Sequence, residues 1–251
     1  MSEKNQKVVL VTGSSGDIGS VIAETFSRRK YFVLGVDEKQ NTRTKTDAFI
    51  RQNLQLLAEH EEARMKFRKK LDSVISGKTL SVVINNAAVQ IVNELDILSP
   101  DDFIKTLHVN TVAPFMLVRI CLDRLKESRG HIINIGSVHA QCSKPGFVAY
   151  ATSKAALAGL TRSLAVELGD SGIKVNCIQP GAVETGMLIA GFENKPDRLA
   201  ELKECIPVGH IGRPKDIAAL ALYLAEQKNG YISGATIPVD GGISSRLHDP
   251  D

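Results

Sequence analysis

Seven short runs of apolar residues, rich in β-branched side chains, recur along the chain, and segments of helical periodicity separate them. Most of the runs are continuously apolar, which is typical of strands that are covered on both faces. This order predicts an α/β fold, in which a wound parallel sheet lies between two helix layers and is joined by right-handed crossovers. The expected strands are residues 7–12, 31–37, 48–53, 80–85, 131–137, 173–179 and 231–239.

Helices are expected between these strands, at residues 18–29, 58–75, 100–126, 147–168 and 214–227. Two stretches are less regular. Within residues 38–55, the polar segment 38–46 is expected to form either a mobile loop or a frayed helix. Residues 186–212 hold prolines and glycines, and we expect this long excursion to be a substrate loop that acts as a lid. No repeat or linker divides the chain, so we expect a single domain spanning residues 1–251.

The composition suits one globular domain, because 43% of the 251 residues are hydrophobic and 24% are charged. The net charge is only +3, and the basic residues between 64 and 70 are interleaved with Met65 and Phe67 as on an amphipathic helix. We therefore expect no nucleic-acid surface. No apolar run approaches the roughly 18 residues of a membrane helix, and the first six residues are polar, so we expect a cytoplasmic protein.

The four cysteines are Cys121, Cys142, Cys177 and Cys205. They form no CxxC pair in a chain too large to need disulfides, so we expect reduced, mostly buried thiols and no metal site. Cys142 follows a polar loop and is the one candidate nucleophile. No basic residue stands beside it in the sequence, so we expect no catalytic role for it.

A glycine-rich turn follows the first expected strand. It reads Thr12-Gly13-Ser14-Ser15-Gly16-Asp17-Ile18-Gly19 and leads into an amphipathic helix. Glycines in such a turn let the backbone approach a pyrophosphate at the helix N-terminus, which predicts a dinucleotide site. The alternative is an ordinary glycine-rich connection. Asp37 ends the second strand 18 residues after Gly19, near the spacing of about 20 expected of a ribose-binding carboxylate.

Asp37 also bears on the choice of dinucleotide. Its carboxylate can accept hydrogen bonds from the ribose diol and would repel a 2′-phosphate. Glu38 and Asp17 add negative charge, and the turn contains no Arg or Lys. These features favour NAD over NADP. The alternative for Asp37 is a helix-capping or surface carboxylate.

A tyrosine, a lysine and a serine form a second group of candidate residues. Tyr150 and Lys154 are four residues apart in an expected helix, so they share one face and are separated by about 6 Å along the axis. A phenol titrates near pH ~10, and an adjacent ammonium can supply much of the shift of about 3 units that a base at neutral pH needs. Ser137 ends the fifth expected strand, at the edge where ligands bind in such sheets. The alternatives are a surface Tyr–Lys pair and a turn-capping serine.

Further motifs follow the glycine turn in a fixed order: Asn85-Asn86-Ala87-Ala88, Asn110 in His-Val-Asn, Ser137, Tyr150 with Lys154, Pro180-Gly181 with Thr185, and Asp240-Gly241-Gly242. Over essentially its full length, the chain therefore resembles the compact, single-domain branch of the short-chain dehydrogenase/reductase family, whose fold is a Rossmann-type doubly wound sheet. Two positions depart from the family pattern. Asp17 stands where a glycine is common, and Asn53 stands where an aspartate commonly contacts adenine.

This resemblance implies a hydride-transfer enzyme acting on CH–OH groups. Tyr150 resembles the family's acid/base, Lys154 the residue that lowers its pKa and binds the nicotinamide ribose, and Ser137 the residue that orients the substrate oxygen. Asn110 resembles the asparagine that interrupts a helix and holds a water in the proton relay; the alternative is an asparagine that only bonds a backbone group. The cofactor-binding residues implied in the same way are Gly13, Ser15, Asp17, Ile18, Asp37, Asn53, Leu54, Asn86, Ala87, Ala88, Tyr150, Lys154, Pro180, Gly181, Val183 and Thr185.

The substrate is expected to contact Ser137, His139, Gln141, Tyr150 and Met187. His139 and Gln141 would suit a polyhydroxylated or acidic molecule, so a sugar or a hydroxy acid is the expected substrate; the alternative is two solvated loop residues. The tail of residues 246–251 is expected either to be mobile or to bring Arg246 and His248 to a neighbouring subunit's pocket.

Small residues on the expected helix 147–168, among them Ala151, Ala155 and Gly159, allow close helix contact. In similar proteins this helix and the helix at 100–126 form a dimer contact, which implies a homotetramer, or a homodimer, with two-fold symmetry. The alternative is that these residues pack inside one subunit.

Two other functions fit parts of the pattern. A protein of this fold can sense NADH without chemistry, but such proteins tend to lose the Tyr–Lys pair or the serine, all present here. The glycine spacing also occurs in sugar-nucleotide epimerases and dehydratases, whose C-terminal substrate domain does not fit into 251 residues. We therefore expect a small-molecule oxidoreductase with no nucleic-acid or membrane partner.

Overall fold

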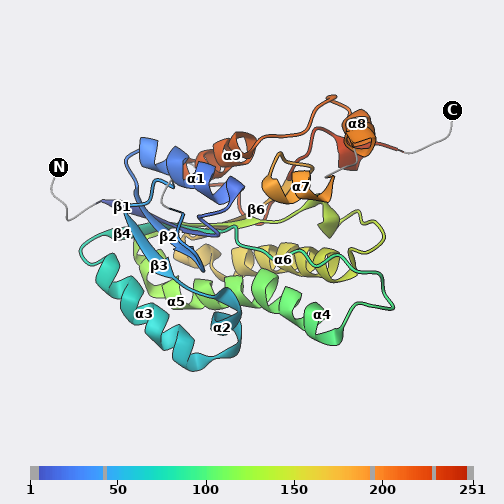
Figure 1. The fold of residues 1–251 in the computed structure, drawn as a ribbon. Coiled ribbons are helices and arrows are strands. Elements are labelled where there is room, and N and C mark those ends of the chain that lie inside the picture. The colour runs from blue at the N-terminus through green and yellow to red at the C-terminus, as the bar shows by residue number, and fades with distance from the viewer. Residues whose placement is uncertain (1–5, 42–43, 193–195, 228–229, 248–251) are drawn as a thin grey trace.

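The computed structural model describes residues 6–41, 44–192, 196–227 and 230–247, and a seven-stranded sheet lies at its centre (Figure 1). The strands are β1 (Lys7–Thr12), β2 (Phe32–Asp37), β3 (Ala48–Arg51), β4 (Thr79–Asn85), β5 (His131–Ile135), β6 (Lys174–Pro180) and β7 (Thr236–Val239). They pair in the order β3-β2-β1-β4-β5-β6-β7, and every pair is parallel. The predicted single Rossmann-like domain is confirmed. The strand order reverses between β1 and β4, and ligands bind beside such a reversal, at the carboxyl ends of the strands.

Alternate residues of β1 serve the two faces of the sheet, as the period of two in a strand requires. Val8 and Leu10 join a core with the helices of one layer, and Val9 and Val11 join a core with the other; all four are fully buried. The first layer contains α2 (Leu54–Glu59), α3 (Glu61–Val74), α5 (Ala113–Ser128) and α6 (Val148–Glu167), and the second contains α1 (Asp17–Arg28) and α9 (Pro214–Glu226), as Figure 1 shows. Strands covered on both faces explain the continuous apolar runs.

The helix predicted at 58–75 is wrong at its start, because two helices occupy this region. α2 begins at Leu54, and Asn53 caps it: the Asn53 Oδ1 accepts a hydrogen bond from the backbone N of Leu56 at 3.3 Å. His60 then has extended backbone (φ −120°, ψ 125°) and separates α2 from α3. The asparagine also ends the preceding strand early, at Arg51, because an N-cap residue leaves the strand to turn into the helix.

The helix predicted at 100–126 is interrupted. It consists of α4 (Pro100–Leu107), a π-helical turn (His108–Val112) that contains Asn110, and α5, which runs on to Ser128. Pro114 has no N–H, so it cannot supply the hydrogen bond that the carbonyl of Asn110 would receive in a regular α-helix. The proline therefore accounts for a local change of helix type next to Asn110.

Two segments near the carboxyl end also differ from expectation. The strand predicted at 231–239 is shorter, since β7 begins at Thr236 and Gly234 has a positive φ of 78°. The irregular stretch 186–212 contains two helices, α7 (Gly186–Gly191) and α8 (Pro196–Cys205). Residues 38–41 and 44–47 form no helix, in agreement with the loop alternative for this segment; residues 42 and 43 lie outside the described residues. Among the described helices, none is both long and apolar enough to cross a membrane.

Candidate active site

The glycine turn packs tightly against the end of β4. Gly13 has a φ of 63°, and a Cβ there would lie 2.8 Å from the Cα of Ala87. A Cβ on Gly19 would overlap the carbonyl oxygen of Gly13, so helix α1 can start this close to β1 only with glycine at position 19. The Nδ2 of Asn86 donates hydrogen bonds to the carbonyls of Thr12 and Gly13, each at 3.1 Å. The structure therefore brings Asn86 and Ala87 directly behind the turn.

Gly16 differs from the other two glycines, because the protein itself does not require a glycine there. Its φ is −80°, and a Cβ would meet only the carbonyl oxygen of Gly13, at 3.5 Å. Gly16 is the N-cap of α1. Because glycine has no side chain, it cannot accept a hydrogen bond from the first N–H groups of the helix. A glycine with open space at a helix N-terminus fits the close approach of a pyrophosphate. The residues present thus fit a dinucleotide cofactor.

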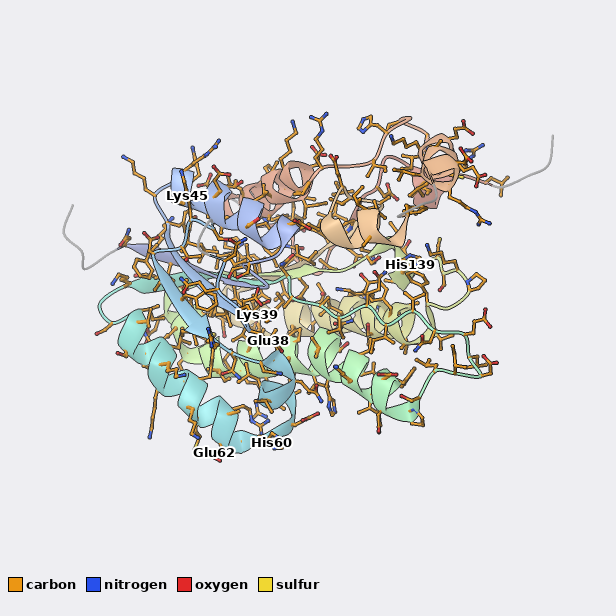
Figure 2. All side chains as sticks on the ribbon, in the orientation of Figure 1. Glu38, Lys39, Lys45, His60, Glu62 and His139 are labelled. Carbon is orange, nitrogen blue, oxygen red and sulfur yellow. The ribbon has the colours of Figure 1, made fainter. Side chains whose placement is uncertain are left out.

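Asp37 joins the glycine turn to the loop after β2. Its Oδ2 accepts a hydrogen bond from the backbone N of Ser15 at 3.0 Å, and its Oδ1 accepts one from the backbone N of Glu38 at 2.8 Å. The Ser15 hydroxyl donates to the carbonyl of Lys39 at 2.6 Å and accepts from the backbone N of Asn41 at 3.1 Å. Figure 2 labels Glu38 and Lys39 in this loop. The predicted ribose-binding carboxylate is therefore fixed beside the turn.

Tyr150, Ser137 and Lys154 meet beyond the carboxyl end of β5. Tyr150 and Lys154 lie one turn apart in α6, and the Lys154 Nζ is 5.6 Å from the centre of the Tyr150 ring. Lys154 is 2% exposed, and its Nζ donates a hydrogen bond to the carbonyl of Ile135, the last residue of β5, at 2.8 Å. The Ser137 side chain is buried and forms a hydrogen bond to Tyr150. The structure brings together the three residues that the sequence singled out.

The electrostatics of this group differ from the sequence-based expectation that Lys154 lowers the pKa of the phenol. Burial raises the pKa of Tyr150 to about 12, and the hydrogen bond with Ser137 opposes that shift. Burial also lowers the pKa of Lys154 to about 8. Low dielectric disfavours both charged forms, and the Lys154 Nζ is directed to a carbonyl oxygen. In this state Tyr150 is a neutral phenol with a proton to donate.

Asn110 is buried in the π-helical turn, and its side chain bonds groups of this chain. Its Oδ1 accepts from the backbone N of Val89 at 2.8 Å, and its Nδ2 donates to the carbonyl of Val89 at 2.9 Å and to the Ser153 hydroxyl at 3.0 Å. The Ser153 hydroxyl donates in turn to the carbonyl of Tyr150 at 2.7 Å. These contacts match the backbone-bonding alternative for the Asn110 side chain. They also connect Asn110 to the helical turn that carries Tyr150.

Sequence reasoning missed Ser153, although it lies three residues after Tyr150, on the same helix face. Its hydroxyl is fully buried and bridges Asn110 to α6. Thr111 contributes similarly, because its hydroxyl donates to the carbonyl of Ser153 at 2.9 Å. The signal was available in the spacing from Tyr150, but a serine in a helix is more often explained by a local backbone hydrogen bond.

The remaining predicted cofactor residues lie in loops or in the first turns of helices. Thr185 caps α7, since its Oγ1 accepts from the backbone N of Leu188 at 3.2 Å. Gly181 follows Pro180 directly after β6, and a Cβ on it would lie 2.8 Å from the Cβ of Asp240. Four more of these residues lie around the site: Ile18 is in the first turn of α1, Leu54 starts α2, Ala88 follows β4, and Val183 forms a bridge with Gly212.

His139, which is labelled in Figure 2, follows Ser137 by two residues and contacts two aromatic rings. Its ring stacks on Phe147 at 4.5 Å and meets Tyr150 edge-on at 6.0 Å. Its Nδ1 donates to the carbonyl of Cys142 at 3.2 Å, which leaves Nε2 as an acceptor on the neutral ring. Burial, together with the charge of Lys144, lowers the pKa of His139 and favours that neutral form.

The other residues predicted to contact the substrate are Gln141 and Met187, and the tail was predicted to be mobile or to reach a pocket. Gln141 is exposed, and its Nε2 donates to the Oε1 of Gln179 at 3.3 Å. Met187 belongs to α7, but its side chain lies outside the described part of the structure. In the tail, Arg246 donates to the carbonyl of Glu204 in α8 at 3.2 Å, and residues 248–251 lie outside the described residues.

The cysteines divide evenly. Cys121 and Cys177 are buried, while Cys142 and Cys205 are exposed, and all four are free. The expectation that most of the thiols are buried is therefore wrong. Within the described ranges, no group of three or more His, Cys, Asp or Glu side chains could hold a metal ion.

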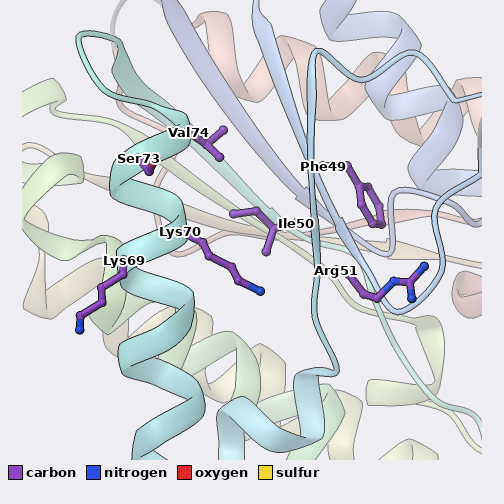
Figure 3. Close-up of a pocket in the computed structure, with 7 residues that line it drawn as sticks. All are labelled: Phe49, Ile50, Arg51, Lys69, Lys70, Ser73 and Val74. Atoms are coloured by element: carbon purple, nitrogen blue, oxygen red, sulfur yellow. The ribbon is translucent and has the colours of Figure 1, made fainter.

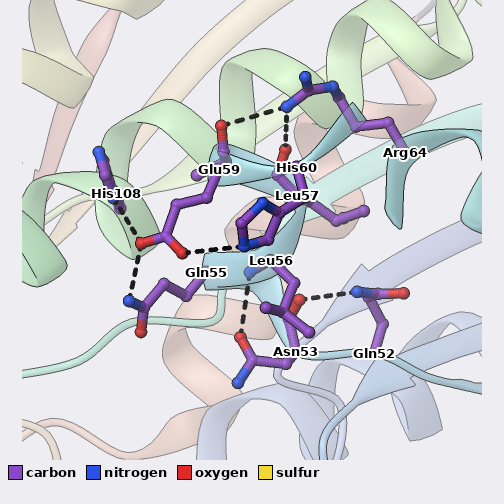
Figure 4. A network of polar contacts seen from close by, with 10 residues as sticks. Gln52, Asn53, Gln55, Leu56, Leu57, Glu59, His60, Arg64 and His108 are labelled. Carbon is purple, nitrogen blue, oxygen red and sulfur yellow. Dashed lines mark hydrogen bonds and ion pairs between the residues drawn. The ribbon is translucent and has the colours of Figure 1, made fainter. Parts of the chain in front are cut away.

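Two further surface features lie near the edge strand β3. A groove of about 450 Å³ between β3 and α3 is lined by Phe49, Ile50, Arg51, Lys69, Lys70, Ser73 and Val74 (Figure 3). It shares no residue with the glycine turn or with the Tyr150 group. A polar network around Glu59 joins α2 to the π-helical turn, because the Glu59 Oε1 lies 3.0 Å from the Nδ1 of His108 (Figure 4). This contact ties the turn that holds Asn110 to the helix that begins after Asn53.

Comparisons with known proteins indicate the family of this chain. A family model described as enoyl-(acyl carrier protein) reductase matches residues 13–244. The 3beta-hydroxysteroid dehydrogenase 1 of Eggerthella lenta is 31% identical over 251 residues, covering 95% of this chain and 94% of the relative. A structure of a 4-hydroxyisoleucine dehydrogenase mutant with NADH and succinate has 29% identity and a TM-score of 0.86, covering 95% of this chain and 99% of its own. A structure of a candidate 2-deoxy-d-gluconate 3-dehydrogenase from Agrobacterium tumefaciens with bound NADP has 26% identity and a TM-score of 0.85, covering 96% of this chain and 97% of its own.

The fold and the site define an α/β oxidoreductase of the dinucleotide-binding class. The chain belongs to the short-chain dehydrogenase/reductase family, as the family model and the relative of similar length show. Members of this family use NAD(P) and act on alcohol or keto groups. The two solved structures hold NADH in one case and NADP in the other.

Proposed function

We propose that this protein is an NAD-dependent dehydrogenase that transfers a hydride between NAD(H) and a secondary alcohol or ketone, with Tyr150 as the acid/base. The observation that carries the proposal is the cluster of Tyr150, Ser137 and Lys154 at the carboxyl end of β5. This cluster lies at the same sheet edge as the glycine turn.

The nicotinamide ring of the bound cofactor supplies or accepts the hydride. The residues of the chain handle the proton and the substrate oxygen. Ser137 donates a hydrogen bond to the carbonyl oxygen of a ketone and orients it, while Tyr150 donates its proton to that oxygen as the alcohol forms. In the oxidative direction Tyr150 takes the hydroxyl proton back. The nearby positive charge of Lys154 stabilises the phenolate that exists between these two states.

Asn110 acts in this proposal as a positioning residue as well as a relay residue. Its side chain fixes the Ser153 hydroxyl, which bonds the carbonyl of Tyr150. Pro114 removes the regular helical partner of the Asn110 carbonyl. That carbonyl is the group that would hold a relay water.

The substrate class we propose is a sugar or a hydroxy acid. His139 offers a neutral ring with an acceptor nitrogen beside Tyr150, and the Gln141 amide adds both a donor and an acceptor. A substrate with hydroxyl groups next to the reacting carbon can use all of these. The related dehydrogenase that holds NADH and succinate supports an acidic substrate, and the candidate gluconate-type enzyme supports a sugar acid.

NAD is the proposed cofactor, because the backbone N–H groups of Ser15 and Glu38 hold the Asp37 carboxylate beside the glycine turn, and a carboxylate there would repel a 2′-phosphate. We further propose that residues 186–212 form the substrate lid and that the chain assembles as a homotetramer, or a homodimer, through α6 and the α4–α5 segment. Light scattering that finds only 27 kDa particles would contradict the assembly.

The test of the function is Tyr150→Phe, which removes one hydroxyl and leaves the ring contacts to His139 and Phe147. The variant should bind NADH with unchanged affinity and lose turnover by about three orders of magnitude or more. Substrates come from a panel of sugars, hydroxy acids and steroid-like alcohols, read by NADH absorbance. Retained turnover would refute the assigned acid/base. NADH binding without turnover on any substrate would favour the sensing function, and turnover without net NADH change would favour an epimerase or dehydratase.

A further inference from the structure

A carboxylate lies directly beside the glycine turn at which the proposed cofactor would bind its pyrophosphate. Asp17 is the first residue of α1, directly after Gly16, and its side chain is exposed. The positive end of the helix dipole attracts either a carboxylate or a phosphate. Two anions at one helix N-terminus repel each other, so Asp17 and a pyrophosphate compete for this position.

The Asp17 side chain already has a partner on a distant segment. Its Oδ2 accepts a hydrogen bond from the backbone N of Gly186 at 2.7 Å, across 169 residues of sequence. Hydrogen bonds to a charged acceptor are shorter and stronger than neutral ones. Gly186 is the first residue of α7 and follows Thr185. Figure 1 shows α7 beside the start of α1.

Nothing else about position 186 demands this contact. A Cβ on Gly186 would meet only the Asp17 Oδ2, at the ordinary distance of 3.5 Å. Thr185 caps α7 through the backbone N of Leu188, so the cap does not use the Gly186 N–H. The Asp17 carboxylate is thus the acceptor that connects the glycine turn to α7.

We propose that Asp17 is a latch that holds α7 against the glycine turn in the dinucleotide-free protein and weakens dinucleotide binding through its charge. The proposal rests on the proposed function, because it requires a dinucleotide at the turn. Binding of the pyrophosphate displaces the Asp17 carboxylate from the Gly186 N–H. Cofactor affinity and the position of α7 are therefore coupled, and the coupling is reciprocal.

Two substitutions separate the charge of the latch from its hydrogen bond. Asp17→Asn keeps the size of the side chain and an acceptor oxygen but removes the charge, and Asp17→Gly removes both. Glu24→Gln is the matched control, because Glu24 lies on the same helix, pairs with Arg28, and is remote from its N-terminus. Thermal unfolding of each variant confirms that it is folded.

The first measurement is calorimetric binding of NADH, with adenosine as a probe that lacks phosphate. Asp17→Asn and Asp17→Gly should bind NADH about three- to tenfold more tightly than the wild type, and this gain should shrink at high salt. Adenosine affinity should not change in any variant, and Glu24→Gln should bind NADH like the wild type. NADH binding to Asp17→Asn that is unchanged or weaker overturns the latch.

The second measurement is amide hydrogen exchange in peptides that cover residues 183–192, without any cofactor. Exchange should be faster in Asp17→Gly than in the wild type, and adding NADH to the wild type should change exchange in the same peptides. Equal exchange in Asp17→Gly and the wild type overturns the latch. Wild-type protein that binds no NADH overturns the proposed function together with the latch, whereas tight wild-type binding without a gain in Asp17→Asn overturns the latch alone.

Discussion

Lys154 lies 5.6 Å from the centre of the Tyr150 ring but donates its hydrogen bond to the carbonyl of Ile135. Burial favours the neutral form of each residue: it raises the pKa of Tyr150 to about 12 and lowers the pKa of Lys154 to about 8. Without a cofactor, Tyr150 is therefore protonated at neutral pH, so it can donate a proton but cannot accept one. A positive charge close to the ring, such as that of protonated Lys154, favours the phenolate that forms when Tyr150 gives up its proton.

The rate of ketone reduction should depend on the protonation of Lys154. The pKa of Lys154 is lowered to about 8, so its positive charge is present below pH 8 and is lost above it. The neutral amine cannot stabilise the phenolate that forms as Tyr150 donates its proton. We expect kcat/KM for reduction to be level from pH 6 to about 8 and to decline at higher pH, with a decline absent from Lys154→Arg. A wild-type profile that stays level to pH 10 would contradict this.

Asn110→Ala should impair both stability and turnover. Three hydrogen bonds disappear, and the backbone N and carbonyl of Val89 lose their partner, so we expect a loss of about 2–4 kcal/mol in the free energy of unfolding. Displacement of the helical turn that carries Tyr150 should lower kcat about 10- to 100-fold. Urea unfolding and steady-state kinetics measure the two effects.

The control for this substitution is Asn134→Ala. Asn134 is equally buried, in β5, and bonds the side chains of Asn85 and Thr161. It should lose similar stability while the folded protein keeps its kcat. If Asn110→Ala also keeps the wild-type kcat, Asn110 has a structural role alone.

The sheet could be predicted because each strand carries its own signal. β1 matches the expected residues 7–12, since apolar side chains cover both faces of a central strand and a glycine turn ends it. The break at His60 could not be predicted, because residues 58–75 keep helical periodicity on both sides of it. Asn53 caps α2, so the first helix begins at Leu54, four residues before the expected start at 58. It ends at Glu59, and α3 begins after the extended residue His60.

The sequence was sufficient to predict which residues form the candidate site, but not which hydrogen bonds their side chains make. The spacing of Tyr150 and Lys154 placed them on one face of a helix, as found. The direction of the Lys154 Nζ depends on Ile135, a residue of another element that spacing cannot reveal. The bond between Asp17 and Gly186 likewise joins segments 169 residues apart, and only the tertiary fold brings them together.

Stability should fall in mild acid because of His131. Burial, with help from Lys174 and Lys7, lowers the pKa of His131 from 6.5 to about 4. Between these values the unfolded chain binds a proton that the folded protein does not, so the stabilising difference is complete above pH 6.5 and is lost as the pH falls toward 4. We expect the Tm to decrease by about 2–5 °C from pH 7 to pH 5. Calorimetry of His131→Leu should show a smaller decrease, and His210→Asn, at an exposed position, should follow the wild type.

Asp37→Ala should change the preference between the two dinucleotides. The substitution removes the carboxylate that would repel a 2′-phosphate and frees the backbone N–H groups of Ser15 and Glu38. We expect the ratio of kcat/KM for NAD to that for NADP to fall about 100-fold, because NAD loses its ribose contacts while NADP loses a repulsion. Glu38→Gln removes a neighbouring charge without touching the turn and should change this ratio far less. A wild-type protein that already prefers NADP, or an unchanged ratio in Asp37→Ala, would show that Asp37 only braces the glycine turn.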